Sequence, residues 1–386
     1  MKTIQGGVTA PFGFTANGIA SGIKKSGKKD LALIYSQTPA VAVGMFTTNI
    51  FKAAHIVFDK KQLKNGRAQA VIVNSGNANC VQGKDGLITA QKMARCTSQT
   101  LGINETDVLV ASTGIIDQKL PVEKVERSVP LMVKNLSKLQ GFAAAQAIMT
   151  TDTKPKQIAV TMKMGGSTVT IGAMAKGAGM IFPHLSFSGK KHATMLAFIT
   201  TDAVIEHRAL RKALKLAVDQ SFNCITVDGQ ESTNDSVFVL ANGLSGNRCI
   251  ELNSKDFKLF CTAIDYVCLE LAKMIIADAE GANKVIKITV KHAKTKEDAK
   301  RVANSVANSI LLKAAVFGGN QNNGRIMAAM GSSGAQFNQS KVEIVPDSFR
   351  KKDIQITIDL KMGDYATTVY TSDLSVNYIR INAGYN

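Results

Sequence analysis

Short runs of β-branched and apolar residues alternate with longer segments of helical periodicity along most of this chain. The short runs have the length and composition of buried strands, and the longer segments repeat their apolar residues along one helical face. Strand-like runs include residues 31–34, 41–46, 70–73 and 108–111, and helical segments include 85–101, 122–138, 208–221 and 256–278. Because such strands are buried beneath helices, the alternation predicts a mixed α/β fold.

The last quarter of the chain repeats this alternation on a smaller scale. A strand-like run at 285–290 precedes a helical segment at 296–312, and further strand-like runs follow at 342–345, 354–360 and 365–371. With 386 residues the chain is long enough for two or three domains. We therefore expect a smaller C-terminal α/β domain over residues 281–386.

The net charge of +18 suggests an anionic partner. Residues 1–193 hold 24 lysines and arginines against 9 aspartates and glutamates, whereas residues 194–386 hold 23 against 20. The lysines form short clusters such as Lys24-Lys25 and Lys28-Lys29, without interleaved aromatics or a zinc-finger or basic-helix pattern. We expect solvated lysine faces that attract small anionic substrates and no nucleic acid; a basic nucleic-acid-binding protein is a remote alternative.

Composition also bears on compartment and cofactors. No apolar run reaches the ~18 residues that a membrane helix needs, and the N-terminus lacks the apolar segment of a secretory signal. The six cysteines form no Cys-x-x-Cys pair, and the five histidines show no spacing typical of a metal site. The sequence predicts a cytoplasmic protein with reduced thiols, no membrane span and no metal.

The Ala193-Thr194 pair stands between a Gly-rich turn around Lys176 and an apolar, strand-like run at 197–201. If the chain cleaves itself at this bond, Thr194 gains a free α-amino group beside its own hydroxyl. That amine has a reference pKa near ~7.7–8, so it serves as a base for the hydroxyl and no histidine is needed. Alternatively, Thr194 is an ordinary threonine that enters a strand.

Many short motifs occur in order along nearly the whole chain. They include Val8-Thr9-Ala10-Pro11, Gly22-Ile23-Lys24, Asn74-Ser75-Gly76-Asn77-Ala78-Asn79, Ser112-Thr113-Gly114, Met149-Thr150-Thr151-Asp152-Thr153, Ala193-Thr194-Met195-Leu196, Ser232-Thr233-Asn234-Asp235, Glu280-Gly281-Ala282 and Gly324-Arg325-Ile326. The chain thereby resembles the ornithine acetyltransferase, or glutamate N-acetyltransferase, family of arginine biosynthesis.

The resemblance implies a layered α-β-β-α sandwich of the self-processing DmpA and ArgJ type, with a smaller C-terminal α/β domain. Cleavage between Ala193 and Thr194 gives an alpha chain, residues 1–193, and a beta chain. In the beta chain, residues 194–280 complete the catalytic domain and residues 281–386 form the C-terminal one. The resemblance further implies an assembly of two alpha and two beta chains.

The resemblance also implies the reaction. Thr194 takes acetyl from N-acetylornithine and passes it to glutamate in a ping-pong cycle, while Thr113 and Gly114 form the oxyanion hole. No metal or redox cofactor is required. Acetyl-CoA as a second acetyl donor, the amino-acid N-acetyltransferase activity, is left open.

Several residues match substrate contacts of that family. Lys176 is suited to a substrate carboxylate and Glu280 to an ammonium, so together they fit an amino acid. Thr150 matches a further contact, with its neighbour Thr151 not excluded. Asn382 matches another and implies that the C-terminal tail folds back over the pocket.

The chain departs from the family pattern at four places. The spacing from Lys176 to Thr194 is about seven residues longer than usual, and the extra segment, roughly Leu185 to His192, is expected to be a solvated loop beside the scissile bond. Asn323 replaces a usual tryptophan, Asp117 stands where glycine is common, and the terminal Ser or Thr contact is missing. A self-processing amidohydrolase or aminopeptidase, or an uncleaved inactive homologue, therefore remains the alternative.

Overall fold

The computed structural model describes residues 1–187 and 195–384. The chain divides into two compact units. The larger unit comprises Met1–Gly177, Pro183–Asn223 and Glu231–Ala272, and the smaller comprises Ala178–Phe182, Cys224–Gln230 and Lys273–Asn386. The smaller unit thus starts before residue 281 and includes two short segments from earlier in the chain.

A nine-stranded sheet forms the centre of the larger unit. Its strands are β1 (Lys2–Ile4), β2 (Phe14–Ile19), β3 (Leu31–Phe46), β4 (Arg67–Asn77), β5 (Val108–Ile115), β6 (Lys156–Met164), β7 (Ser167–Lys176), β8 (Leu196–Thr201) and β9 (Ser236–Ala241). Their order is β1-β6-β7-β8-β9-β3-β4-β5, with β2 beside β3. The parallel pairs are β8 with β9 and β4 with β5.

Strand β3 joins the two parts of this sheet. The sequence predicts two short strands here, but the structure has one strand of 16 residues. Its first half pairs with β4 and its second half with β9, and the register with β4 shifts between Tyr35 and Ala40. Pro39 lies within this shift, where its missing N–H interrupts no regular ladder.

The strands bury both faces. Leu31 and Leu33 of β3 belong to a core with α2 and α3, whereas Ala32 and Ile34 belong to a second core. That second core also contains Phe198 of β8 and Phe238 of β9, so it lies between the two parts of the sheet. One face of these strands therefore packs against helices and the other against further strands. The predicted layered α/β architecture is confirmed.

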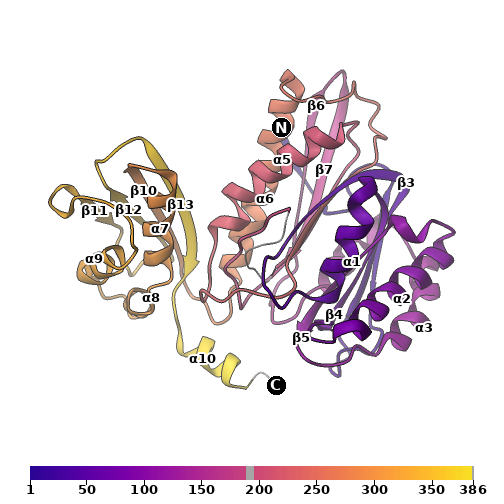
Figure 1. The fold of residues 1–386 in the computed structure, drawn as a ribbon, viewed down its shortest axis with the longest axis horizontal. Coiled ribbons are helices and arrows are strands. Elements are labelled where there is room, and N and C mark those ends of the chain that lie inside the picture. Colours follow the sequence, from indigo (N-terminus) through magenta and orange to yellow (C-terminus); the bar gives the residue numbers. More distant parts are fainter. Residues whose placement is uncertain (188–194, 385–386) are drawn as a thin grey trace. The chain divides into compact units, whose positions relative to one another are not determined.

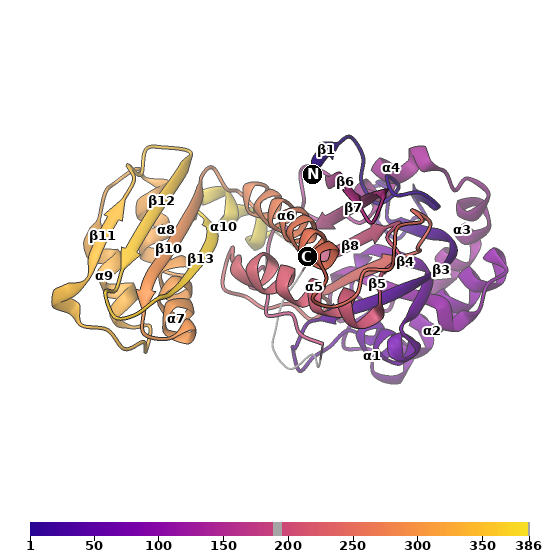
Figure 2. The same cartoon turned by 90° about the horizontal axis from the view of Figure 1, so that it is seen from above.

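Among the described residues, six α-helices belong to the larger unit in whole or in large part. They are α1 (Ala54–Gln62), α2 (Gly83–Leu101), α3 (Val122–Lys134), α4 (Gly141–Ala147), α5 (His207–Gln220) and α6 (Lys255–Ala277). Figures 1 and 2 show α1, α2 and α3 along β3, β4 and β5, and α5 beside α6. None of the described helices is long and apolar enough to cross a membrane.

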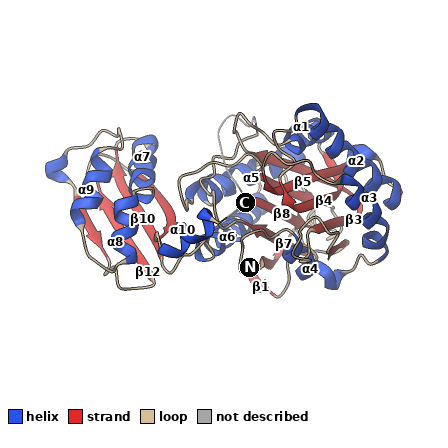
Figure 3. Cartoon of the chain, turned by 90° about the horizontal axis from the view of Figure 1, so that it is seen from below, coloured by secondary structure: helices blue, strands red, loops and turns tan. Residues whose placement is uncertain are grey.

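The smaller unit has a four-stranded sheet covered by helices (Figure 3). Its elements are β10 (Val285–Ala293), α7 (Lys296–Ala307), α8 (Ile310–Phe317), α9 (Asn323–Gly331), β11 (Glu343–Pro346), β12 (Asp353–Asp359), β13 (Tyr365–Ser372) and α10 (Val376–Ala383). The order is β11-β12-β10-β13. The single helix predicted over 296–312 is wrong, because the Ser309 side chain caps a new helix by accepting from the Leu312 amide.

Candidate active site

The predicted oxyanion residues lie where two parallel strands end. Thr113 and Gly114 directly precede Ile115, the last residue of β5, and Gly114 pairs with Gly76 of β4 where the register of the two strands shifts. We call this irregular end of β5 the Thr113-Gly114 turn, or oxyanion turn. Gly114 has φ +134°, and a Cβ at this position would lie only 2.4 Å from the Gly76 carbonyl carbon. Only glycine fits both this conformation and this approach. The turn therefore brings backbone and the buried Thr113 hydroxyl into one fixed place.

Lys176 reaches this turn from β7, of which it is the last residue. Its side chain is buried, and Nζ donates a hydrogen bond of 3.2 Å to Thr113 Oγ1. The structure thus brings together two predicted site residues that are 63 positions apart in the chain. An ammonium beside the predicted oxyanion turn is suited to hold a carboxylate or to stabilise negative charge.

Asp152 connects the segments that carry two predicted substrate contacts. Its Oδ2 accepts from the Thr150 amide at 3.0 Å, and its Oδ1 accepts from the Gly177 amide at 2.8 Å. The same Oδ1 accepts from Lys156 Nζ at 2.6 Å, in a pair whose side chains are 0 % and 2 % exposed. Asp152 thus fixes the backbone at Thr150 and directly after Lys176. The sequence motif that contains Asp152 did not indicate this role.

The charge of Asp152 is stable in this environment. Burial alone raises the pKa of the carboxyl, but Lys176, Lys156 and the hydrogen bonds outweigh burial and hold the pKa well below its usual range. The carboxylate is therefore ionised at neutral pH. Removing one partner of such a buried pair leaves an uncompensated charge.

The Ser232–Asp235 motif lies against the same turn. Asn234 Nδ2 donates to the carbonyls of Ala78 at 2.6 Å and of Ser112 at 2.7 Å, directly before Thr113. Asp235 is fully buried, and burial raises the pKa of its carboxyl well above the usual value, against opposing effects of the Met195 amide and Lys176. The sequence did not predict these roles of Asn234 and Asp235. Only the presence of the motif indicated this segment.

The two residues of the predicted scissile bond, Ala193 and Thr194, lie outside the described residues. Their neighbour Met195 is described, and its carbonyl accepts from the Ser236 amide at 3.1 Å. Directly after it, β8 runs between β7 and β9 in the sheet. The described chain therefore resumes one residue after Thr194, beside Asp235.

The remaining predicted contacts belong to the smaller unit. Asn382 of α10 donates from Nδ2 to Glu280 Oε2 at 2.8 Å, so these two predicted contact residues lie side by side. The start of α10 is tied by Ser375 Oγ to the Gly281 carbonyl at 2.6 Å. A Cβ at Gly179 would lie 2.3 Å from the Glu280 carboxylate, so glycine allows this approach. Among the described residues the carboxylate of Glu280 accepts from the Asn382 side-chain amide, and a carboxylate with such a neutral partner can still bind an ammonium.

The extra segment before the predicted cleavage point begins with docked residues. Leu185 is buried, and Ser186 exchanges backbone hydrogen bonds of 3.0 and 3.1 Å with Phe46. The Arg211 guanidinium lies 3.6 Å from the ring centroid of Phe187. The prediction of a solvated loop is wrong for these three residues, because the edge of β3 and α5 provide partners; residues 188–192 lie outside the described residues.

Another departure has a local explanation. Asp117 has φ +62°, a left-handed conformation that glycine adopts most easily. Its amide donates to the Cys80 carbonyl at 3.3 Å. The backbone at this position therefore keeps the conformation that favours glycine, with aspartate in its place.

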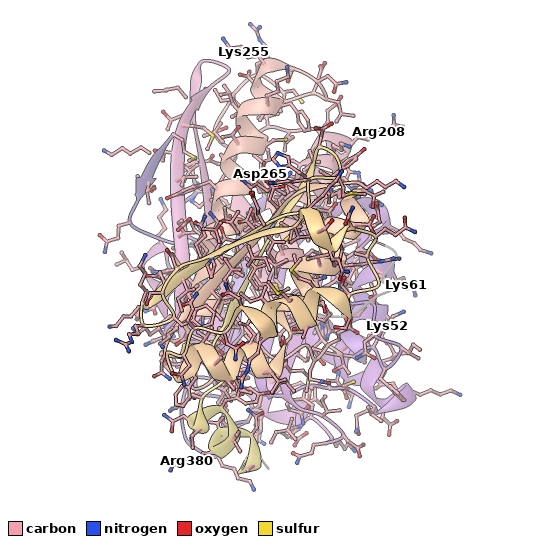
Figure 4. The ribbon with its side chains drawn as sticks, turned by 90° about the vertical axis from the view of Figure 1, so that its left-hand side faces the viewer. Lys52, Lys61, Arg208, Lys255, Asp265 and Arg380 are labelled. Atoms are coloured by element: carbon pink, nitrogen blue, oxygen red, sulfur yellow. The ribbon has the colours of Figure 1, made fainter. Side chains whose placement is uncertain are left out.

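The positive charge is distributed over several elements. Figure 4 labels Lys61 on α1, Arg208 on α5 and Lys255 at the start of α6, and all three are exposed. Among the described residues, no group of three histidine, cysteine, aspartate or glutamate side chains is arranged to hold a metal ion. The features that converge on one place are instead those around Thr113, Lys176 and Asp152.

Comparisons with known proteins agree with the motifs. The model of the ArgJ family matches residues 15–386. The chain is 46% identical over 407 residues to the arginine biosynthesis bifunctional protein ArgJ of Symbiobacterium thermophilum, and 45% identical over 416 residues to the glutamate N-acetyltransferase of Methanocaldococcus jannaschii. Both alignments cover 100% of this chain and 100% of the relative.

Among solved structures, one similar chain is the ornithine acetyltransferase of Mycobacterium tuberculosis in complex with ornithine. It is 41% identical in sequence with a TM-score of 0.46, and the match covers 48% of this chain and 99% of that chain. The family model and the full-length relatives confirm the assignment made from the motifs: this chain belongs to the ArgJ family.

Proposed function

We propose that this protein is a glutamate N-acetyltransferase that cleaves itself between Ala193 and Thr194 and then transfers acetyl from N-acetylornithine to glutamate. The observation that carries the proposal is the convergence of the Thr113-Gly114 turn and Lys176, with the described chain resuming at Met195 beside them. The name of one full-length relative, glutamate N-acetyltransferase, supports glutamate as the acetyl acceptor.

In the proposed cycle, Thr194 Oγ attacks the acetyl carbonyl of N-acetylornithine while its own α-amine takes the hydroxyl proton. The Thr113-Gly114 turn binds the oxyanion, a contribution of ~2.7–4 kcal/mol for one well-placed donor. The C–N bond then breaks, the proton passes to the leaving amine, and ornithine departs from an acetyl ester of Thr194. The glutamate amine attacks this ester and leaves as N-acetylglutamate, which restores the hydroxyl.

The substrate ends are assigned by charge. Lys176 holds the α-carboxylate, and Asp152 keeps the backbone at Thr150 and Gly177 in place for it. In the smaller unit, Glu280, which accepts from Asn382, is the proposed partner of an ammonium group. No cofactor is needed, acetyl-CoA is an optional second donor, and the active form contains two alpha and two beta chains in the cytoplasm.

The proposal is tested first by intact mass and N-terminal sequencing of purified protein. We expect a fragment that starts at Thr194, and its loss in Thr194→Ala. Glutamate should then accelerate ornithine release from N-acetylornithine. Cleavage without this acceleration would indicate an amidohydrolase, and a single uncut 41.2 kDa chain would overturn the self-activating mechanism.

A further inference from the structure

A cavity of about 670 Å³ opens in the larger unit beside the Thr150 segment. A volume in this range is typical of small-molecule sites. Two kinds of side chain dominate its lining: the ammonium groups of Lys24, Lys28 and Lys29, and the hydroxyls of Thr150, Thr151 and Thr153. We call it the lysine cavity. None of the lysines has a role in the proposed transfer reaction.

The three lysines of the cavity form no direct ion pair within the described part of the chain. Lys24 Nζ donates to the carbonyls of Met149 at 2.7 Å and of Lys29 at 2.8 Å. Lys29 Nζ donates to the Gly18 carbonyl at 2.8 Å. No ion pair is formed by these two lysines or by Lys28 among described residues. Asp152 also lines the cavity, but its Oδ1 accepts from Lys156 Nζ and the Gly177 amide. Three cations therefore line the cavity without a direct ion pair to any described residue.

The lowered pKa of Lys24 shows that its charged form is destabilised in this cavity. Burial, together with the charges of Lys176 and Lys28, lowers the pKa of its ammonium to about 8, against the opposing effects of Asp30 and Asp152. An anion in the cavity would offset the desolvation and stabilise the charged form. The cavity is thus better suited to an anionic ligand than to a neutral one.

The lysine cavity adjoins the candidate active site. Lys24 packs on β4 so closely that a Cβ at Gly76 would lie 2.9 Å from Lys24 Cγ. Gly76 in turn pairs with Gly114 of the oxyanion turn. On the other side, Lys24 holds the Met149 carbonyl, one residue before Thr150. A ligand in the cavity would therefore lie near the acyl-transfer centre.

We propose that the lysine cavity binds a phosphate group. A dianion with several acceptor oxygens matches several ammonium groups and threonine hydroxyls better than a single carboxylate does. The ligand is either free phosphate or the phosphate of an acyl thioester donor such as acetyl-CoA. Binding itself does not depend on the proposed transferase activity, whereas the assignment to an acyl donor rests on it.

Inorganic phosphate is the probe for the first test, by titration calorimetry at constant ionic strength. Lys28→Gln removes an exposed cation that lines the cavity, and Lys25→Gln removes an exposed cation of the same loop that does not. We expect saturable binding that is weakened about three- to fivefold by Lys28→Gln and is unchanged by Lys25→Gln. Equal losses in both variants, or no saturable binding below about 10 mM, would overturn the proposal.

The second measurement separates the two sources of phosphate. If phosphate inhibits acetylation of glutamate competitively against acetyl-CoA but not against N-acetylornithine, the cavity holds the phosphate of the thioester donor. If it competes with neither while the contrast between Lys28→Gln and Lys25→Gln holds, the cavity is a site for free phosphate. A protein without transferase activity that still shows the contrast would refute the proposed function and leave the cavity assignment standing.

Discussion

The two regions that hold the predicted substrate contacts are built differently. Around Asp152 in the larger unit, the polar side chains are buried and each carboxylate oxygen has defined donors. Around Glu280 in the smaller unit, Asn382 is exposed and α10 buries none of its residues. Buried, fully bonded groups resist displacement, whereas an exposed short helix moves at low cost. The first region is suited to fix geometry, and the second to admit and release ligand.

Gly114→Ala should have the largest effect of the changes that probe the buried region. Its Cβ would lie 2.4 Å from the Gly76 backbone in a left-handed conformation. The turn must shift, and we expect kcat to fall by ~10²–10³ through loss of oxyanion donors. Gly331→Ala is the control, since a Cβ there meets nothing within 4 Å. The test is kcat from steady-state kinetics on both variants. Equal activities would show that the turn is not the oxyanion hole.

Asp152→Asn should destabilise the fold strongly. It leaves Lys156 buried without its carboxylate partner, a change that costs about 3–5 kcal/mol in comparable buried pairs. Asp347, which pairs with Lys351 at the same i,i+4 spacing but on the surface, provides the matched control. Denaturant unfolding of Asp347→Asn should show an unchanged midpoint. If both variants unfold alike, burial does not distinguish the two pairs.

The pH dependence of the free energy of unfolding should also depend on the Asp152 charge. Because the folded-state pKa of Asp152 lies below its unfolded value of about 3.9, its contribution is present above that value and is lost as pH falls through the folded pKa. Asp235 has a raised pKa, so its contribution has the opposite sign and is lost as pH rises. Between pH 8 and pH 3 the free energy of unfolding should therefore fall less steeply toward acid in Asp152→Asn than in the unchanged protein, with the difference appearing below about pH 5. In Asp235→Asn the free energy of unfolding should instead rise at the upper end of this pH range.

Asn382→Ala should have the smallest effect and probes the exposed region. It removes one hydrogen bond of 2.8 Å to Glu280, worth ~0.5–1.5 kcal/mol. We expect KM for the amino acid substrates to rise ~3–10-fold, with kcat and the unfolding midpoint nearly unchanged. Arg380→Ala on the same helix is the control. A fall in kcat alone would place Asn382 in the chemistry and not in binding.

The sequence predicted much of this arrangement because its signals are local. Apolar periodicity located the strands and helices, and the motifs located Thr113, Gly114, Lys176 and Glu280. The periodicity failed over 296–312, where both parts of the segment are helical and a single capping serine makes the break. It also failed to predict that β3 is continuous, since pairing with β4 and β9 decides where a strand ends.

By itself, the sequence determined the family, the mixed α/β alternation and the residue types available for acyl transfer. Only the tertiary structure decided that Lys176 meets Thr113 and that Asp152 binds the backbone amides of Thr150 and Gly177. It alone showed that Lys24, Lys28 and Lys29 line a cavity and are not simply a solvated face. The physical reason is that hydrogen bonds and burial depend on distances between residues far apart in the chain, which strand pairing sets and local periodicity does not encode.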